Sequence, residues 1–173
     1  LVQPTYVEMD AISTQVDVVS GDICDAGPPA VYEYYSDHFA MVTITADLFN
    51  PSATFDPLPL YIERYKIDFY RAADSTGAPP IESVDQGTFI QIVPPTRALP
   101  TATTTTAYIQ FVDMGRKDKY ESDIDSGRYT SWGNYYNNYT ASVTFYGKNA
   151  NGKAFTIGPT NVSFSMGHYL ICP

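Results

Sequence analysis

The clearest pattern along this chain is the alternation of apolar and polar residues with a period of two, which is typical of half-buried β-strands. Residues 38–48 place Ala40, Val42, Ile44, Ala46 and Leu48 on one side and Phe39, Met41, Thr43 and Thr45 on the other. Residues 60–71, 88–93 and 103–112 are also rich in β-branched and aromatic residues, and residues such as Gly, Pro and Asn separate these segments. We therefore predict a strand in each segment.

A β-hairpin is predicted near the end of the chain. Residues 139–146 alternate in the same way, residues 147–152 form a turn-rich connection with an Asn-Gly pair, and residues 155–157 resume the pattern. The alternation returns at residues 162–166, after Gly158-Pro159, so we expect the last strand to be broken or bulged at that step. No segment has the apolar spacing of a helix, and the predicted class is all-β.

About eight strands of this kind favour an antiparallel two-layer sandwich, with a barrel as the second choice, because one face of each strand is apolar and must be covered. Residues 62–71 and the hairpin at 141–153 resemble immunoglobulin-like domains of exported bacterial surface proteins, over residues 38–166. The resemblance implies adhesion, scaffolding or assembly, with no catalytic residues. The pattern of two cysteines around a core tryptophan is absent, since Trp132 lies far from Cys24 and Cys172 in sequence.

Residues 1–37 are predicted to form an extended N-terminal arm, and residues 38–173 the sandwich domain. Residues 5–12 and 15–19 are extended in pattern, and Gly and Pro residues follow them. The arm could add an edge strand to its own domain or enter the sheet of a neighbouring subunit. The arm residues predicted to make this contact are Tyr6, Val7, Met9 and Ile12.

Composition and charge narrow the classes of partner. The 173 residues include 10 Lys and Arg against 19 Asp and Glu, a net charge of −9, which opposes binding to nucleic acid. Charged residues make up only 17% and aromatic residues 14%, a composition that favours a folded chain. Charged residues or Pro interrupt every apolar stretch, so we expect no membrane span.

The two cysteines and the first residue favour an exported protein. Leu1 stands where a nascent chain has Met, as in a processed chain or a fragment. Cys24 and Cys172 are too few for a zinc site, and they are predicted either to pair as a disulfide or to be two unrelated buried thiols. Asn138 and Asn161 each begin a glycosylation triplet, a pattern that also arises by chance. The predicted location is extracellular or at the cell surface.

No pattern for catalysis or for a cofactor is present. His38 and His168 are the two histidines, and neither lies in a motif of a hydrolase, so we predict a protein that is not an enzyme. Asp118, Glu121, Asp123 and Asp125 are the best candidates for a metal site. They do not match the spacing of an EF-hand, and neighbouring Lys and Arg residues favour a solvated loop of mixed charge instead.

Five aromatic residues close in sequence form the remaining candidate site: Tyr129, Trp132, Tyr135, Tyr136 and Tyr139. Such a cluster can cap the core, lie in a subunit interface, or stack on a sugar ring. The first functional hypothesis is a non-enzymatic structural or interaction protein that assembles into a homo-oligomer, a filament or a surface layer by strand addition of its N-terminal arm. The alternative is a carbohydrate-binding or adhesion module with a glycan as partner.

Overall fold

The computed structural model describes most of the chain: residues 2–9, 14–19, 23–27, 29–32, 35–48, 56–96, 98–99, 101–129 and 136–169. For residues 2–9, 23, 25, 32 and 48 it describes the backbone alone. The elements are β1 (Val2–Met9), β2 (Gln15–Asp17), β3 (Ile23–Asp25), β4 (Val31–Tyr32), β5 (His38–Leu48), β6 (Leu60–Arg71), β7 (Val84–Ile92), β8 (Thr103–Val112), α1 (Met114–Asp125), β9 (Tyr136–Asn149) and β10 (Ala154–Gly167).

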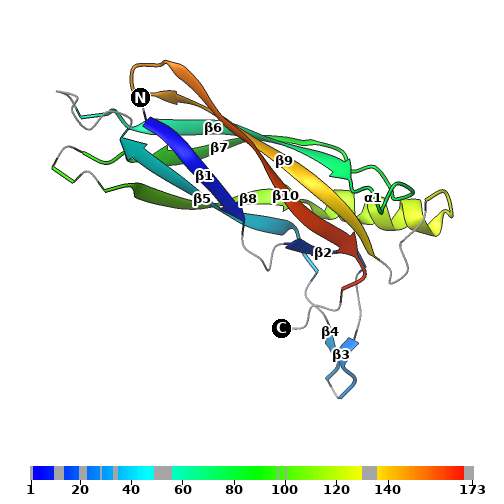
Figure 1. Cartoon of the computed structure of the whole chain (residues 1–173). Helices are drawn as coiled ribbons and strands as arrows, with labels where there is room; N and C mark the ends of the chain where they lie inside the picture. The colour runs from blue at the N-terminus through cyan, green and yellow to red at the C-terminus, as the bar shows by residue number, and fades with distance from the viewer. Residues whose placement is uncertain are drawn as a thin grey trace.

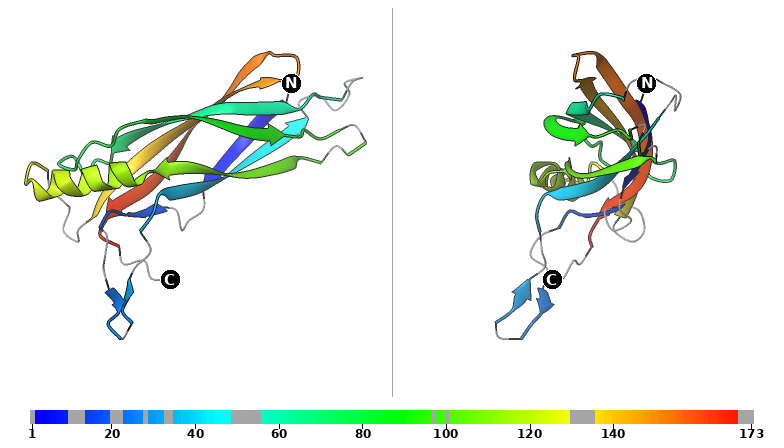
Figure 2. Two further views of the ribbon diagram at one scale, coloured as in Figure 1. Left: turned by 180° about the vertical axis from the view of Figure 1, so that it is seen from behind. Right: turned by 90° about the vertical axis from the view of Figure 1, so that its left-hand side faces the viewer.

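The strands form two main sheets and one small hairpin. The first sheet has the order β1-β5-β8, the second the order β2-β10-β9-β6-β7, and β3 pairs with β4 (Figure 1). The hairpin projects away from the two main sheets, and α1 lies at one end of the molecule (Figure 2). The prediction of a mostly β fold is confirmed.

The prediction that the sheets are purely antiparallel is wrong at one edge. β2 pairs with β10 in parallel, from Gln15 opposite Ser165 to Asp17 opposite Gly167. Parallel neighbours need a long connection between them, and here most of the chain separates the two strands. Sequence alternation carries no signal of strand direction.

Individual strands follow the sequence closely. β5, β6 and β8 occupy the predicted ranges, and β7 begins four residues earlier than predicted, at Val84. β9 and β10 form the predicted hairpin, with a register shift between Ile157 and Thr160. The expected bulge at the Gly-Pro step is therefore confirmed.

The core lies between the inner faces of the two main sheets. Alternate residues of β5, such as Val42 and Ile44, are fully buried. The ring of Phe111 on β8 packs edge-on against Phe164 on β10, with the ring centroids 4.9 Å apart, and both rings contact Phe69 on β6. Aromatic residues from both sheets thus hold the layers together.

Side chains join the two sheets where β7 and β8 face each other. The Tyr65 hydroxyl has two acceptors within hydrogen-bond distance of its single hydrogen, Oε1 of Gln86 at 2.9 Å and the carbonyl oxygen of Gln110 at 3.0 Å. Nε2 of Gln86 donates to Oε1 of Gln110 at 2.6 Å, and Nε2 of Gln110 donates to Asp37 at 2.7 Å. This polar network closes one side of the fold.

The prediction of a loop around residues 118–127, in a chain without helices, is wrong, because this region forms α1. Asp113 caps the helix by accepting a hydrogen bond from the backbone N–H of Arg116 at 2.8 Å, and Gly127, with φ of +68°, follows its end. Only Lys117 and Tyr120 are buried on α1. A helix that buries so few residues lacks the apolar spacing by which helices are recognised.

Candidate functional site

The edge of the three-stranded sheet is filled by the segment that the sequence predicts as an assembly arm. β1 pairs antiparallel with β5, from Val2 opposite Leu48 to Met9 opposite Val42, with a register shift between Pro4 and Tyr6. Three predicted arm residues, Tyr6, Val7 and Met9, lie on this strand, and Ile12 lies outside the described residues. In this structure the arm therefore pairs with its own domain.

The connection between β1 and the next strand is short. β1 belongs to the three-stranded sheet and β2 to the five-stranded sheet, and only residues 10–14 separate them in sequence. On β5, Val42, Ile44 and Ala46 are fully buried where β1 covers the edge of their strand. Removal of β1 would thus leave backbone groups of a long strand without their partners.

The three described members of the predicted aromatic cluster, Tyr129, Tyr136 and Tyr139, lie in different surroundings. Tyr139 is buried in the core, where its hydroxyl donates to the carbonyl oxygen of Pro79 at 2.7 Å. Burial raises its pKa. Tyr136 stacks on Tyr169 with ring centroids 6.3 Å apart, whereas the Arg71 guanidinium lies over Tyr129 at 5.8 Å. Trp132 and Tyr135 lie outside the described residues.

The four candidate metal ligands lie on α1 but point to different partners. Asp118 accepts a hydrogen bond from the Tyr35 hydroxyl at 3.0 Å, and Asp123 forms an ion pair with Lys119 at 2.8 Å. Glu121 and Asp125 line a pocket instead. Among the residues that the structure describes, no group of three or more His, Cys, Asp or Glu side chains could hold a metal ion.

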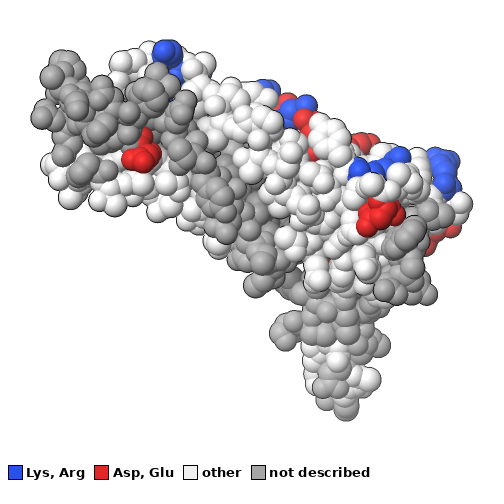
Figure 3. All heavy atoms as spheres, viewed as in Figure 1, with Lys and Arg blue, Asp and Glu red and all other residues white. Residues whose placement is uncertain are grey.

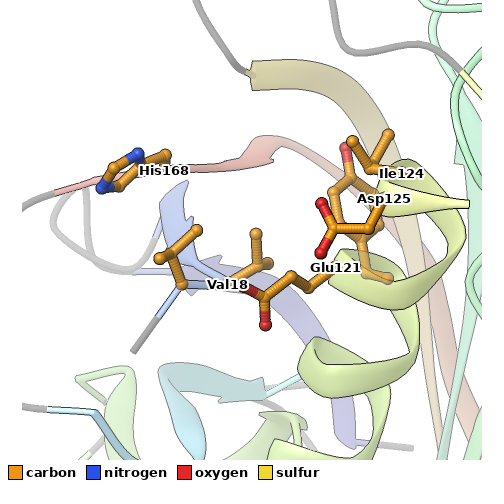
Figure 4. Close-up of a pocket in the computed structure, with 7 residues that line it drawn as sticks. Val18, Glu121, Ile124, Asp125 and His168 are labelled. Carbon is orange, nitrogen blue, oxygen red and sulfur yellow. The ribbon is translucent and has the colours of Figure 1, made fainter. Parts of the chain in front are cut away.

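This pocket lies between α1, the residues that follow β2, and His168 at the end of β10. Its volume is about 210 Å³, and its lining residues are Val18, Val19, Tyr120, Glu121, Ile124, Asp125 and His168. Glu121 and Asp125 project from adjacent turns of the helix, Val18 faces them, and His168 lies on the opposite side (Figure 4). Burial, together with the charges of Asp125, Asp118 and Asp17, raises the pKa of Glu121.

A second, more open groove lies where β9 and β10 pair near the start of β2. Its volume is about 380 Å³, and it is lined by Thr14, Ala72, Asn138, Tyr139, Thr140, Ser163, Phe164 and Ser165. None of these residues carries a charge. Sequence reasoning missed this groove, because its members come from segments far apart in the chain.

The predicted glycosylation and disulfide residues are placed as follows. Nδ2 of Asn138 donates to Asp74 at 2.9 Å, and Asn161 is exposed on β10. Cys24 is half-buried on β3, and Cys172 lies outside the described residues, so their pairing stays a prediction.

Several exposed aromatic side chains were also missed by sequence reasoning. Phe89 on β7 is 73% exposed and stacks on Tyr61, and Tyr108 on β8 is 69% exposed. The guanidinium of Arg64 on β6 lies over the ring of Tyr146 on β9, 4.3 Å from the ring centroid. Phe89 and Tyr108 occupy the outward-facing positions of alternating strands, and this position in the pattern is the sequence signal that could have identified them.

Comparison with known proteins identifies no family. No protein-family model and no curated protein matches the chain. A solution structure of a protein from Arabidopsis thaliana is similar at a TM-score of 0.34 and 10% sequence identity, covering 95% of this chain and 77% of that one. Within the described residues, no helix is long and apolar enough to cross a bilayer.

Proposed function

We propose that this chain is a non-enzymatic structural protein that assembles with copies of itself by exchanging strand β1. The observation that supports the proposal is the position of β1, which fills the edge of one sheet while residues 10–14 lead directly to the other sheet. A copy that donates β1 to the β5 edge of a second copy makes the same backbone contacts that it makes within one chain. Such an exchange is a low-cost route to an oligomer.

The short connection allows β1 to pair with its own domain, as in this structure, and is also suited to exchange between copies. A short hinge that must reach between two sheets limits the ways in which β1 can fold back, whereas an extended hinge can reach a neighbour. If each copy donates its strand to the next one, the contact is head-to-tail, and it continues into a filament unless the rotation closes a ring. Concentration then decides between closed monomers and the assembly.

We also propose that the protein is exported and that its two main sheets form an immunoglobulin-like fold. Two packed sheets and the predicted disulfide between Cys24 and Cys172 suit a protein that acts outside the cell. A surface layer or filament needs stable domains joined by backbone pairing, which β1 and β5 can supply.

A cross-linking experiment with two single variants tests the exchange. Glu8 lies opposite Thr43 in the β1–β5 pair, and opposite residues have Cα atoms roughly 4.5–5.5 Å apart, which suits a disulfide. One sample carries Glu8→Cys and the other Thr43→Cys. The two samples are mixed, concentrated and oxidised. A disulfide between Cys at position 8 of one copy and Cys at position 43 of another should then appear as a covalent dimer on a non-reducing gel.

The control replaces the second partner with Thr156→Cys, an exposed site on β10 away from β5, and should give no pair. Light scattering of the unmodified chain is measured over the same concentrations. The exchange of β1 is refuted if assemblies form but Glu8→Cys and Thr43→Cys do not cross-link. Self-assembly itself is refuted if the mass stays at one chain throughout.

A further inference from the structure

The open groove on the outer side of β9 and β10 has the chemistry of a sugar site. On the outward face, Asn138 and Thr140 on β9 lie opposite Ser165 and Ser163 on β10. Hydroxyl and carboxamide groups both donate and accept hydrogen bonds, as the hydroxyl groups of a sugar do. A volume of about 380 Å³ falls within the range of known ligand sites, roughly 300–1,000 Å³.

The stacked rings of Tyr136 and Tyr169, here called the aromatic wall, adjoin this groove without being among its lining residues. Tyr136 precedes Asn138 on the same face of β9, and its ring stacks on that of Tyr169 at an interplanar angle of 28°. The Tyr169 hydroxyl donates to Oγ of Ser165 at 2.7 Å, which ties the wall to the groove. Rigid tyrosine rings beside serine and asparagine side chains combine apolar contact with adaptable hydrogen bonding.

Hydrogen bonds hold the polar side chains in place. The Asn138 backbone N–H donates to Oγ of Ser75 at 2.8 Å, and its Nδ2 donates to Asp74, which fixes the plane of the carboxamide. Oγ of Ser165 donates to the carbonyl oxygen of Thr14 at 3.4 Å. Groups positioned in advance lose little freedom when a ligand binds.

The absence of charge in the lining decides the class of ligand. None of the described residues that line the groove is Lys, Arg, Asp or Glu, and Figure 3 shows uncharged atoms over much of the middle of this face. An anionic glycan or a phosphate would find no cation among these described lining residues, and the net charge of −9 would repel it. We propose that the groove binds a neutral carbohydrate, with the Tyr136–Tyr169 wall beside the ring and Asn138, Thr140 and Ser163 on its hydroxyl groups.

Apart from Thr14 and Ala72, the described lining residues of the groove belong to β9 and β10, whereas β1 belongs to the three-stranded sheet, so this proposal is tested separately from strand exchange. The test uses the full chain on an array of neutral and anionic glycans. Neutral oligosaccharides that bind are then titrated into isotope-labelled protein. The amide signals of Asn138, Thr140 and Ser163 should shift, with dissociation constants obtained from the titration.

Two variants and a matched control complete the test. Ser163→Phe fills the groove from an exposed position, and Tyr169→Ala removes half of the wall; each should weaken binding by about tenfold or more. Thr156→Phe makes the same kind of change on β10 outside the groove and should leave binding unchanged. Urea unfolding of each variant verifies that it is folded.

Three results would overturn the proposal. The first is an array on which no neutral glycan binds, and the second is binding restricted to anionic glycans. The third is a folded Ser163→Phe variant that binds a neutral glycan as tightly as the unchanged chain.

Discussion

Gly147 lies on β9 between β10 and β6, and its replacement by alanine tests the packing of the five-stranded sheet. It pairs with Ile62 on β6 and with Phe155 on β10. A Cβ atom there would lie 2.7 Å from Cζ of Phe155, 3.0 Å from Cα of Ile62, and closer still to the carbonyl oxygen of Tyr61. Two of these three atoms belong to backbone, which cannot rotate away, so the strands themselves must move apart.

The expected cost follows from that overlap. Overpacking costs roughly 1–3 kcal/mol, and contact with backbone of a central strand places Gly147→Ala near the upper end, at about 3 kcal/mol. For a domain of this size, each kcal/mol lowers the melting temperature by roughly 2–4 °C, so a fall of about 6–12 °C is expected. Calorimetry measures the shift, and urea unfolding gives the free energy.

Gly87→Ala is the matched control on β7, the edge strand of the same sheet. Its added Cβ would meet nothing nearer than the carbonyl oxygen of Glu63, at 3.9 Å. Alanine in place of glycine within a strand then stabilises by roughly 0.5–1 kcal/mol, because the unfolded chain loses freedom. The reasoning is refuted if the Gly147→Ala variant melts within about 2 °C of the Gly87→Ala variant.

Three further predictions concern the core, the pocket and the cysteines. Tyr139→Phe should lose about 1–2 kcal/mol of unfolding free energy in urea, since it removes the hydrogen bond to the buried carbonyl of Pro79; an unchanged value would contradict this. Burial and neighbouring carboxylates raise the pKa of Glu121, so ionisation destabilises the folded state: Glu121→Gln should be more stable than the unchanged chain at pH 7, and the difference in urea midpoint should vanish below the ordinary pKa of 4.5. If Glu121→Gln remained more stable than the unchanged chain below pH 4.5, ionisation of Glu121 would not be the cause of the difference. Mass spectrometry without reduction should find no alkylated thiol, and modification of both Cys24 and Cys172 would exclude their disulfide.

The strands could be predicted from the sequence because alternation reports directly which face of a strand is buried. Residues 38–48 show this, since alternate positions from Ala40 to Ala46 are fully buried on β5. The pairing of β2 with β10 could not be predicted, because the two strands stand at opposite ends of the chain. Their contact depends on the packing of the whole domain rather than on local pattern.

The helix was missed for a different physical reason. α1 has Asp113 at its N-cap and Gly127 beyond its end, and both are sequence signals of a helix. The rest of the helix is polar, and only Lys117 and Tyr120 are buried. The apolar spacing typical of a helix is therefore absent, and this absence outweighed the two capping signals in the sequence prediction. Capping residues deserve more weight where a segment lies at one end of a sheet and covers little of the core.

The candidate sites, like the fold, could be predicted from the sequence only in part. The aromatic residues near position 136 were visible in sequence, but alternation along β9 sends Tyr139 into the core and leaves Tyr136 beside Tyr169. The groove itself needs β9 and β10 side by side, together with Thr14 from the start of β2. A sequence can name such residues, but only the fold brings them together.

The parallel pairing of β2 and β10 has a mechanical consequence. A pull applied upstream of β2 and downstream of β10 drives the two strands past each other along their length, because they run in the same direction. The pairs from Gln15–Ser165 to Asp17–Gly167, and the bond from the Val18 N–H to Gly167 at 3.0 Å, then share the load in shear instead of breaking one after another. Tension carried through the chain along this path therefore meets its resistance at the shortest strand of the five-stranded sheet.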